Sequence, residues 1–390
     1  MAAVSNPFMP TYAPPTVTFV RGRGTELWDH QGRRYLDFLG GLAVTSLGHA
    51  HPAVAEALCA QAGTLLHVSN LFGNPLGPQV AATLDRLLGG GGQVFLCNSG
   101  AEANECAIKL ARKWGRRGRY GVVSAYGSFH GRTLATLTAT GQPSKHEPFQ
   151  PLPDGFRYAA WDDVDDVARQ VDPTVVAAVL LEPLQGEGGV QPASAGFLRG
   201  VREICDERGV LLIVDEIQTG LGRTGRWWGF EHAGIRPDIV TSAKALGNGV
   251  PIGACWARAD IAEAFQPGDH GSTFGGQPLA CSAAIATLRV MQDEDVPARA
   301  AAAGVRLAKA LEALAGVTHV RGLGLLLAAE LDPAVLERDG GAKGVQARLL
   351  EAGLVVNAVT ASALRFAPPL LVSDEEIDEA VAMVREVLAA

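Results

Sequence analysis

The stretch VLLIVDEIQTGLGRTG, residues 210–225, decides the fold, because an unbroken apolar run leads directly into two carboxylates, Asp215 and Glu216. A short, continuously apolar run is typical of a strand that is buried on both faces in a parallel sheet. Nucleotide hydrolases also place a carboxylate at the end of such a strand, where it holds a magnesium ion. The first question is therefore what Asp215 holds.

The rest of the chain argues against a nucleotide. A hydrolase of that kind needs a Walker A loop, G-x-x-x-x-G-K-[ST], to cradle the phosphates, and the sequence contains no Gly-Lys pair. The H-R-D and D-F-G elements of protein kinases are absent as well. No G-x-G-x-x-G loop follows a first strand, which counts against a dinucleotide-binding oxidoreductase. Asp215 must have another partner.

Length and composition limit which classes of protein are possible. The chain has 390 residues, of which 47% are hydrophobic, and it can bury a large core in two domains or one large one. Its formal net charge of -8 argues against nucleic-acid binding. No apolar run approaches the ~18 residues of a membrane span, and the N-terminus lacks the features of a signal peptide. We expect a cytoplasmic protein without nucleic-acid or membrane partners.

Neither the cysteines nor the histidines indicate a metal. The six cysteines form no C-x-x-C pair and mostly lie in apolar stretches, which is typical of reduced core thiols. His49 and His51 have no further ligand types at suitable spacing, so we interpret them as a loop pair and predict no metal site. We interpret the basic segment 109–120 as the solvated C-terminal turn of a helix.

Short apolar strands alternate with helical segments through the middle of the chain. The expected strands are 93–97, 119–125, 174–182, 210–215 and 238–243, and the expected helices include 101–115 and 196–209. This alternation predicts a mostly parallel sheet with helices on both faces. Ligands of such sheets collect at the carboxyl ends of the strands. The polar residues at those ends are Asn98, Ser99, Glu182, Asp215 and Lys244.

The last hundred or so residues have a different character. An Ala-rich helical stretch from about 278 to 315 leads into short apolar segments and a final amphipathic helix. We predict a large domain over 51–277 and a smaller α+β domain that combines 1–50 with 278–390.

Three features at the strand ends combine into one kind of site. Residues 99–101 follow a strand and open a helix, so their backbone N–H groups can bind an anion. Lys244 lies among small residues, where burial would lower the pKa of its amine and activate it for Schiff-base chemistry. Taken singly, Ser99 is better explained as an N-cap and Lys244 as a surface lysine. Together with a buried Asp215, they are the parts that pyridoxal phosphate requires.

Four motifs occur in order along the chain: SFHGRT, VDEIQTGLGRTG, SAKALGNG and STFGGQPLA. With them the chain resembles the class III (omega-amino-acid) aminotransferases of fold type I, most closely the acetylornithine aminotransferase group, over nearly its whole length. The resemblance implies an α/β fold with a large, mostly parallel, seven-stranded sheet and a smaller α+β domain. It also implies pyridoxal 5'-phosphate as the cofactor.

The same resemblance assigns the cofactor site. Lys244 and Asp215 would be catalytic, Lys244 through a Schiff base with the cofactor and Asp215 through the ring nitrogen. Gln218 would bond the ring hydroxyl, and Phe129 would stack on the ring face. The phosphate would also be reached by Thr273 of a neighbouring subunit, which implies a homodimer with shared active sites. The implied cofactor-binding residues are Ser99, Gly100, Ala101, Phe129, Asp215, Glu216, Ile217, Gln218, Lys244 and Thr273.

The resemblance also assigns the substrate site. Arg365 would hold the carboxylate of glutamate next to the reacting amine, since a guanidinium pairs with a carboxylate in a bidentate manner. Glu187 would neutralise Arg365 when the donor has no such carboxylate, although the two could equally form a structural ion pair. Arg132 would hold the distal carboxylate. The implied substrate-binding residues are Arg132, Glu187, Ser272, Arg365, Tyr12 and Leu42.

Some positions depart from the family pattern. Leu42 stands where ornithine aminotransferases tend to carry a tyrosine, and an aliphatic residue there suits an acylated amine better than a charged one. Tyr12 matches a tyrosine of both groups and discriminates neither. Ala101 replaces a frequent threonine, so phosphate binding would rely on the backbone there, and Gln277 stands where asparagine is commoner.

The implied reaction moves the terminal amino group of N2-acetylornithine to 2-oxoglutarate, giving N-acetylglutamate 5-semialdehyde and glutamate, as in arginine biosynthesis. Ornithine, succinyl-ornithine, succinyl-diaminopimelate and 4-aminobutyrate remain open as amino donors. A glutamate-semialdehyde aminomutase is a more remote alternative, against which the pairing of Arg365 with Glu187 counts.

Overall fold

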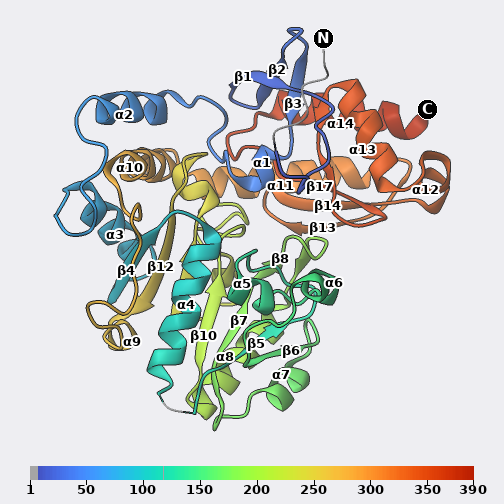
Figure 1. Cartoon of the computed structure of the whole chain (residues 1–390). Coiled ribbons are helices and arrows are strands. Elements are labelled where there is room, and N and C mark those ends of the chain that lie inside the picture. The colour runs from blue at the N-terminus through green and yellow to red at the C-terminus, as the bar shows by residue number, and fades with distance from the viewer. Residues whose placement is uncertain (1–7, 117) are drawn as a thin grey trace.

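A seven-stranded sheet forms the centre of the computed structural model, which describes residues 8–116 and 118–390 (Figure 1). Its strand order is β4-β12-β11-β10-β7-β5-β6. Strand β12 runs antiparallel to both of its neighbours, and the other six strands are parallel to one another. The strands are β4 (Gly92–Cys97), β5 (Gly121–Ala125), β6 (Phe156–Ala159), β7 (Val176–Leu181), β10 (Leu211–Asp215), β11 (Ile239–Ser242) and β12 (Gly253–Arg258). The predicted large, mostly parallel sheet is confirmed.

All five strands expected in this region are present, but β6 and β12 were not expected. The sequence of β12 is GACWAR and that of β6 is FRYA. Glycine and alanine have weak strand propensity, and β6 lacks a continuous apolar run. These two strands form because they pair with neighbours that are already buried, which a local pattern does not reveal.

The alternation of side chains along β10 explains how the sheet is covered. Leu211 and Ile213 pack with α4 (Gly100–Trp114), whereas Leu212 and Val214 pack in the core that includes α8 (Ala195–Arg208). Successive residues of a strand point to opposite faces, so Asp215 continues the series of Leu211 and Ile213. Its carboxylate therefore points toward α4, which lies across the sheet in Figure 1.

Two smaller sheets join distant parts of the chain. One has the order β1-β2-β3-β15 and the other β13-β14-β17-β16. Pairing of β3 with β15 is parallel and places an N-terminal strand beside a C-terminal one. Figure 1 shows the blue N-terminal strands next to the red C-terminal helices α13 and α14. These strands are β1 (Phe19–Arg23), β2 (Glu26–Asp29), β3 (Arg34–Asp37), β13 (Val317–Leu323), β14 (Leu326–Leu331), β15 (Leu354–Val355), β16 (Asn357–Ala358) and β17 (Ala363–Phe366).

Helices α11 (Val296–Glu312), α13 (Ala342–Ala352) and α14 (Asp374–Ala389) pack with these smaller sheets and with one another. These contacts bring both ends of the chain together, and the division into two domains stays a prediction. Helix α10 (Pro278–Asp293), however, packs mainly against α2 (Pro52–Ala62) and α3 (Leu76–Leu87). The boundary between 277 and 278 therefore stays a prediction.

The remaining elements are short. They are α1 (Gly40–Ala43), α5 (Leu134–Ala139), α6 (Pro143–His146), η1 (Glu147–Phe149), α7 (Val164–Gln170), β8 (Leu184–Gln185), β9 (Gln191–Pro192), η2 (Gly229–His232), η3 (Lys244–Gly247), α9 (Ala259–Ala262) and α12 (Pro333–Asp339). Within residues 8–116 and 118–390, no helix is long and apolar enough to cross a bilayer.

One local prediction needs correction. The helical stretch expected over 278–315 is broken, because Asp295 adopts a left-handed backbone with φ 45° and Pro297 follows it at the start of α11. Arg112 and Lys113 lie in the last turn of α4 and Lys113 is exposed, as expected for the basic segment 109–120, of which residue 117 lies outside the described residues. Lys113 forms an ion pair with Asp269, and the Arg112 guanidinium lies 5.2 Å from the centre of the Phe156 ring.

The pair His49 and His51 lies in a loop, as expected. His49 Nε2 lies 2.7 Å from Asp37 Oδ2, so this histidine pairs with a carboxylate. Across the residues that the structure describes, no group of three or more Cys, His, Asp or Glu side chains is arranged to hold a metal ion.

The packing of α11 gives a stability prediction. A Cβ atom at Gly304 would collide with the backbone carbonyl of Gly324, whereas one at Gly196 in α8 would meet only Ser194 Oγ, at 3.9 Å. We expect Gly304→Ala to lower the free energy of unfolding by about 1–3 kcal/mol through overpacking. The same change at Gly196 should raise it by about 0.5–1 kcal/mol, because alanine loses less backbone entropy in a helix. Denaturant titration checks both, and equal effects at the two sites would refute the packing argument.

Candidate active site

A cavity of about 390 Å³ opens at the carboxyl ends of the strands. Its lining brings together ten of the residues proposed from the sequence, which come from segments far apart in the chain. They are Ser99, Gly100, Ala101, Phe129, Arg132, Glu187, Asp215, Ile217, Gln218 and Lys244.

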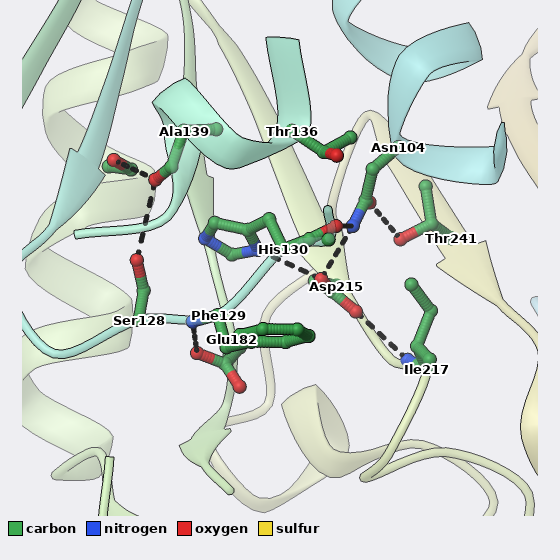
Figure 2. A network of polar contacts seen from close by, with 12 residues as sticks. Asn104, Ser128, Phe129, His130, Thr136, Ala139, Glu182, Asp215, Ile217 and Thr241 are labelled. Atoms are coloured by element: carbon green, nitrogen blue, oxygen red, sulfur yellow. Dashed lines mark hydrogen bonds and ion pairs between the residues drawn. The ribbon is translucent and has the colours of Figure 1, made fainter. Parts of the chain in front are cut away.

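Asp215 is held at the end of β10 by three hydrogen bonds (Figure 2). Its Oδ2 accepts from Asn104 Nδ2 and from His130 Nδ1, both at 2.8 Å, and its Oδ1 accepts from the backbone N–H of Ile217 at 3.0 Å. Because a carboxylate can only accept, Nδ1 of His130 carries the proton. Asn104 is fixed in turn, since it accepts from the Thr241 hydroxyl at 2.8 Å. Asp215 is thus a buried, oriented negative charge with acceptor capacity left on Oδ1.

Lys244 follows β11 in a left-handed backbone conformation with φ 42°, which places its side chain in the cavity. Burial lowers the pKa of its amine to about 8, and Arg365 adds to the lowering while Glu187 opposes it. In the described part of the chain, the amine forms neither an ion pair nor a hydrogen bond. A lysine in this state can act as a nucleophile near neutral pH.

The N-terminus of α4 forms the anion-binding end of the cavity. Ser99 caps the helix, its hydroxyl accepting from Glu102 N at 3.2 Å. The N–H groups of Gly100 and Ala101 precede the first intrahelical bonds and lie at the positive end of the helix dipole. A Cβ at Gly100 would lie 2.7 Å from Ile217 Cδ1, so only glycine leaves room here.

Glu182 orders the wall opposite α4. Its Oε2 accepts from the backbone N–H of Phe129 at 3.1 Å and its Oε1 from that of Gly186 at 3.3 Å. Burial raises the pKa of Glu182 well above its ordinary value, and the nearby Asp215 adds to the shift. One buried carboxyl group therefore positions both the Phe129 ring and the loop that carries Glu187.

Arg365 reaches the site from β17. Its Nη1 lies 2.5 Å from Glu187 Oε1, and its Nε donates to Asn357 Oδ1 at 3.0 Å. Arg365 is 1% exposed, yet its Nη2 has no hydrogen-bond partner among the described residues. Burial alone would raise the pKa of Glu187, but the Arg365 charge holds it below its ordinary value. The site thus contains a partly buried ion pair, and the Nη2 nitrogen of its guanidinium has no partner among the described residues.

Arg132 lies at the mouth of the same cavity. Its guanidinium carbon is 5.7 Å from the centre of the Phe129 ring, and the side chain is exposed. It has no anionic partner in the part of the chain that the structure describes. A second cation is therefore available at a distance from the buried Arg365.

Six of the proposed residues do not line this cavity, and one of them is Arg365, which contacts it through Glu187. Glu216 is buried behind it, its carboxylate accepting from Phe230 N at 2.9 Å and from the Thr219 hydroxyl at 2.6 Å. Tyr12 and Leu42 are exposed. Thr273 and Ser272 belong to a neighbouring loop, where Ser272 Oγ accepts from Asn98 Nδ2 at 3.0 Å.

Sequence reasoning missed His130, Asn104 and Thr241 as partners of Asp215. A signal existed for Asn104, since it shares the apolar face of α4 with Ala107, Ile108 and Ala111. A polar side chain at such a position needs a buried partner. His130 lies inside the SFHGRT motif, but nothing in the pattern tells which way it points.

Pyridoxal phosphate fits these residues. The cavity has free backbone donors at a helix N-terminus for a phosphate, an oriented carboxylate for a ring nitrogen, and a reactive lysine amine for an aldehyde. The fold and the site together define an enzyme of the pyridoxal-phosphate-dependent class.

Comparison with known proteins makes this assignment specific. The model of the aminotransferase class-III family matches residues 8–388. Acetylornithine aminotransferase of Corynebacterium efficiens is 47% identical over 388 residues, covering 97% of this chain and 94% of that protein. The enzyme of the same name from Aquifex aeolicus is 46% identical, with coverages of 97% and 99%. The ornithine aminotransferase structure from Toxoplasma gondii superimposes with a TM-score of 0.92 at 37% identity, covering 98% of this chain and 92% of that one.

This chain belongs to the aminotransferase class-III family. It is therefore a pyridoxal-phosphate-dependent transaminase, and the expected fold, family and cofactor are confirmed. The roles of the individual site residues stay predictions.

The state of Lys244 can be tested by covalent capture of the cofactor. We expect the rate at which cofactor-free protein captures pyridoxal phosphate to rise with pH and to level off above about 8, because the amine reacts only when deprotonated. The measurement is the mass gained after borohydride reduction. Lys244→Ala should abolish the gain, and Lys309→Ala, at an exposed position of α11, should not. A rate that keeps rising to about pH 10, as for an ordinary lysine, would contradict the assignment.

Proposed function

We propose that this transaminase moves the terminal amino group of N2-acetylornithine to 2-oxoglutarate, giving N-acetylglutamate 5-semialdehyde and glutamate. The ion pair between Arg365 and Glu187 carries the proposal, because it suits an enzyme that alternates between two kinds of amino donor. Several relatives that are 45–47% identical over nearly the whole chain are named acetylornithine aminotransferase, which supports it.

The two donors differ at the reacting carbon. Glutamate carries a carboxylate there, which can bind Arg365 through Nη1 and the unpartnered Nη2 once Glu187 moves aside. The terminal carbon of N2-acetylornithine carries no carboxylate, so Arg365 would be left buried and unpaired. Glu187 then supplies the missing charge. Its side chain is 34% exposed, against 1% for Arg365, so it is the partner with room to move.

Arg132 would hold the other end of either donor. Both glutamate and N2-acetylornithine carry a carboxylate remote from the reacting amine, and Arg132 is an exposed cation of the cavity lining with no anionic partner among the described residues. A fixed distal contact lets the enzyme place two donors of different length in one site.

The remaining residues would hold the cofactor, which when bound supplies an aldehyde for amine exchange and a ring that accepts electrons. Residues 99–101 would bind its phosphate, Phe129 would cover one face of the ring, and Gln218 would bond the ring hydroxyl. Asp215, held by Asn104 and His130, would keep the ring nitrogen protonated. Lys244 would carry the cofactor and, once released, move a proton at the reacting carbon.

We also propose a homodimer in the cytoplasm. Leu71, Phe72 and Phe274 are 60–86% exposed, which is unusual for large apolar side chains in one region. A second copy of the chain would cover them and bring Thr273, Ser272, Tyr12 and Leu42 toward the partner's cavity. The six cysteines are unpaired, which fits a reducing compartment. Sedimentation velocity tests the dimer.

A panel of amino donors with 2-oxoglutarate tests the reaction. We expect the highest kcat/KM with N2-acetylornithine, a lower value with succinyl-ornithine or 4-aminobutyrate, and the lowest with free ornithine, because Leu42 offers no partner for an α-ammonium group. A preference for ornithine would instead favour the activity named in the Toxoplasma gondii structure.

Removal of Glu187 should shift the choice between donors. In Glu187→Ala, glutamate should react as well as in the original protein or better, since nothing competes for Arg365. The N2-acetylornithine half-reaction should slow, and the ratio of the two rates should change roughly 10- to 100-fold, less than for a fully buried pair. Single-turnover absorbance with each donor measures this, and Glu187→Gln should lie in between. Equal slowing of both half-reactions would make Glu187 a structural residue.

Replacement of Asp215 should separate binding from turnover. We expect Asp215→Asn to retain cofactor absorbance but to lose about a thousand-fold in kcat, because a neutral amide cannot hold the ring proton. Asp238→Asn is a matched control, since Asp238 is also buried beside the sheet but pairs with Arg202 and Arg258. It should affect stability and leave kcat within a few-fold. Normal turnover in Asp215→Asn would remove Asp215 from the catalytic site.

A further inference from the structure

The loop that carries Glu187 is unusually confined. It joins β8 to β9 and contains glycine at 186, 188 and 189. A Cβ at Gly186 would collide with Gln218, and one at Gly188 would lie 2.6 Å from the Gly127 carbonyl oxygen. The backbone of this loop therefore lies against the cavity wall, and Glu187 is the one long side chain it presents.

The N-terminal side of the loop is held by the catalytic site itself. Glu182 accepts from Gly186 N, and Arg365 Nη1 donates to Gly186 O at 3.4 Å. These contacts come from the two residues that already define the wall and the ion pair. They fix where the loop begins but not where it ends.

The C-terminal side is held from a different sheet. Arg321, on β13, donates from Nε to the Gly189 carbonyl at 2.9 Å and from Nη1 to Glu330 Oε2 at 2.7 Å. The Arg321 side chain is only 13% exposed, and Glu330 lies on the neighbouring strand β14. The Glu330 carboxylate thus orients the Arg321 guanidinium, which in turn binds the loop.

At the C-terminal end of the loop, two successive residues have a positive φ angle. Gly189 has φ 107°, and a Cβ there would lie 3.0 Å from Thr360 Cγ2. Val190 is fully buried with φ 54°, a conformation that is sterically unfavourable for a β-branched residue. Such strain persists only where neighbouring contacts over-determine the conformation. Arg321 supplies the side-chain hydrogen bond to Gly189 at this end, beside the backbone bond from Val190 N to Gly186 O at 3.3 Å.

We propose that Arg321 is a positioning residue for the choice of amino donor: by holding the Gly189 carbonyl, it keeps the loop in the conformation that presents Glu187 to Arg365. The inference deepens the proposed function and rests on its two-donor scheme. Arg321 does not line the cavity, so it acts only through Glu187.

The direction of the effect follows from competition for Arg365. When the hydrogen bond to Gly189 is lost, the loop spends more time in conformations where Glu187 is away from Arg365. A dicarboxylate then displaces Glu187 more easily, whereas a donor without a carboxylate at the reacting carbon meets an unpaired Arg365 more often. One charge-assisted hydrogen bond supports a change of about ten-fold in the ratio of the two half-reactions.

The test compares Arg321→Met with Glu330→Gln in the cofactor-loaded enzyme. Arg321→Met removes both contacts, and Glu330→Gln removes the ion pair but leaves the bond to Gly189. We expect Arg321→Met to bind glutarate several-fold more tightly by calorimetry and to shift the ratio of glutamate to N2-acetylornithine half-reactions about ten-fold toward glutamate. Amide hydrogen exchange in residues 184–192 should speed up. Glu330→Gln should change each quantity less than two-fold.

A double variant decides whether Arg321 acts through Glu187. Adding Arg321→Met to Glu187→Ala should change the donor ratio no further, because the side chain being positioned is gone. Independent, additive effects would overturn the proposal, as would an unchanged glutarate affinity in a folded Arg321→Met protein. If Arg321→Met fails to fold, Arg321→Lys serves instead, since one ammonium cannot reproduce both contacts and should shift the ratio in the same direction.

These outcomes separate the inference from the proposed function. If the original protein does not use N2-acetylornithine, the proposed function fails, but glutarate affinity and loop exchange still report on Arg321. If the original protein uses it well and Arg321→Met behaves like Glu330→Gln, only the inference fails.

Discussion

A negative charge held inside the protein at the edge of the central sheet is the constraint on which the rest of the site depends. Asp215 keeps that charge because Asn104, His130 and the backbone of Ile217 donate to it. Burying a carboxylate is costly unless its oxygens are satisfied in this way. The requirement explains why a polar side chain sits on the apolar face of α4 and why His130 is turned inward. The helix that supplies Asn104 also supplies the N–H groups proposed to bind the phosphate, so one element would serve both ends of the cofactor site.

Features encoded within short segments could be predicted from the sequence. The strand that ends at Asp215, the cap at Ser99 and the small residues around Lys244 each depend on neighbours within a few positions. The sheet, the α4 start and the lysine placement follow from them. Contacts between distant segments could not be predicted. Such contacts depend on which distant segments the tertiary fold brings together. Examples are the pairing of β12 with β4 and β11, the hydrogen bond between His130 and Asp215, and the hydrogen bond from Arg321 to the Gly189 carbonyl. The resemblance to a family supplied the pair of Arg365 and Glu187, which no local pattern indicates.

The active site is assembled from two parts of the molecule with different tasks. The central sheet and α4 supply the residues that would hold the cofactor, and the small sheet of β13, β14, β16 and β17 supplies Arg365 and Arg321. Arg223 joins the two parts, since its buried guanidinium donates to the carbonyls of Leu325 and Pro368. In the proposed scheme, donor choice would therefore depend on contacts across this junction, whereas the chemistry common to all donors would depend on residues of the central sheet and α4.

The alternating faces of β10 carry a consequence for how this enzyme can change over time. Asp215 reaches α4 because it stands an even number of residues after Leu211. Insertion or deletion of a single residue within the strand would turn the carboxylate toward α8, away from Asn104 and His130, even if every side chain were retained. Loops such as the one that carries Glu187 can change in sequence and length to suit new donors, but the number of residues in β10 cannot change. Insertions and deletions are therefore tolerated in the loops, whereas within the five residues of β10 they would misplace the Asp215 carboxylate.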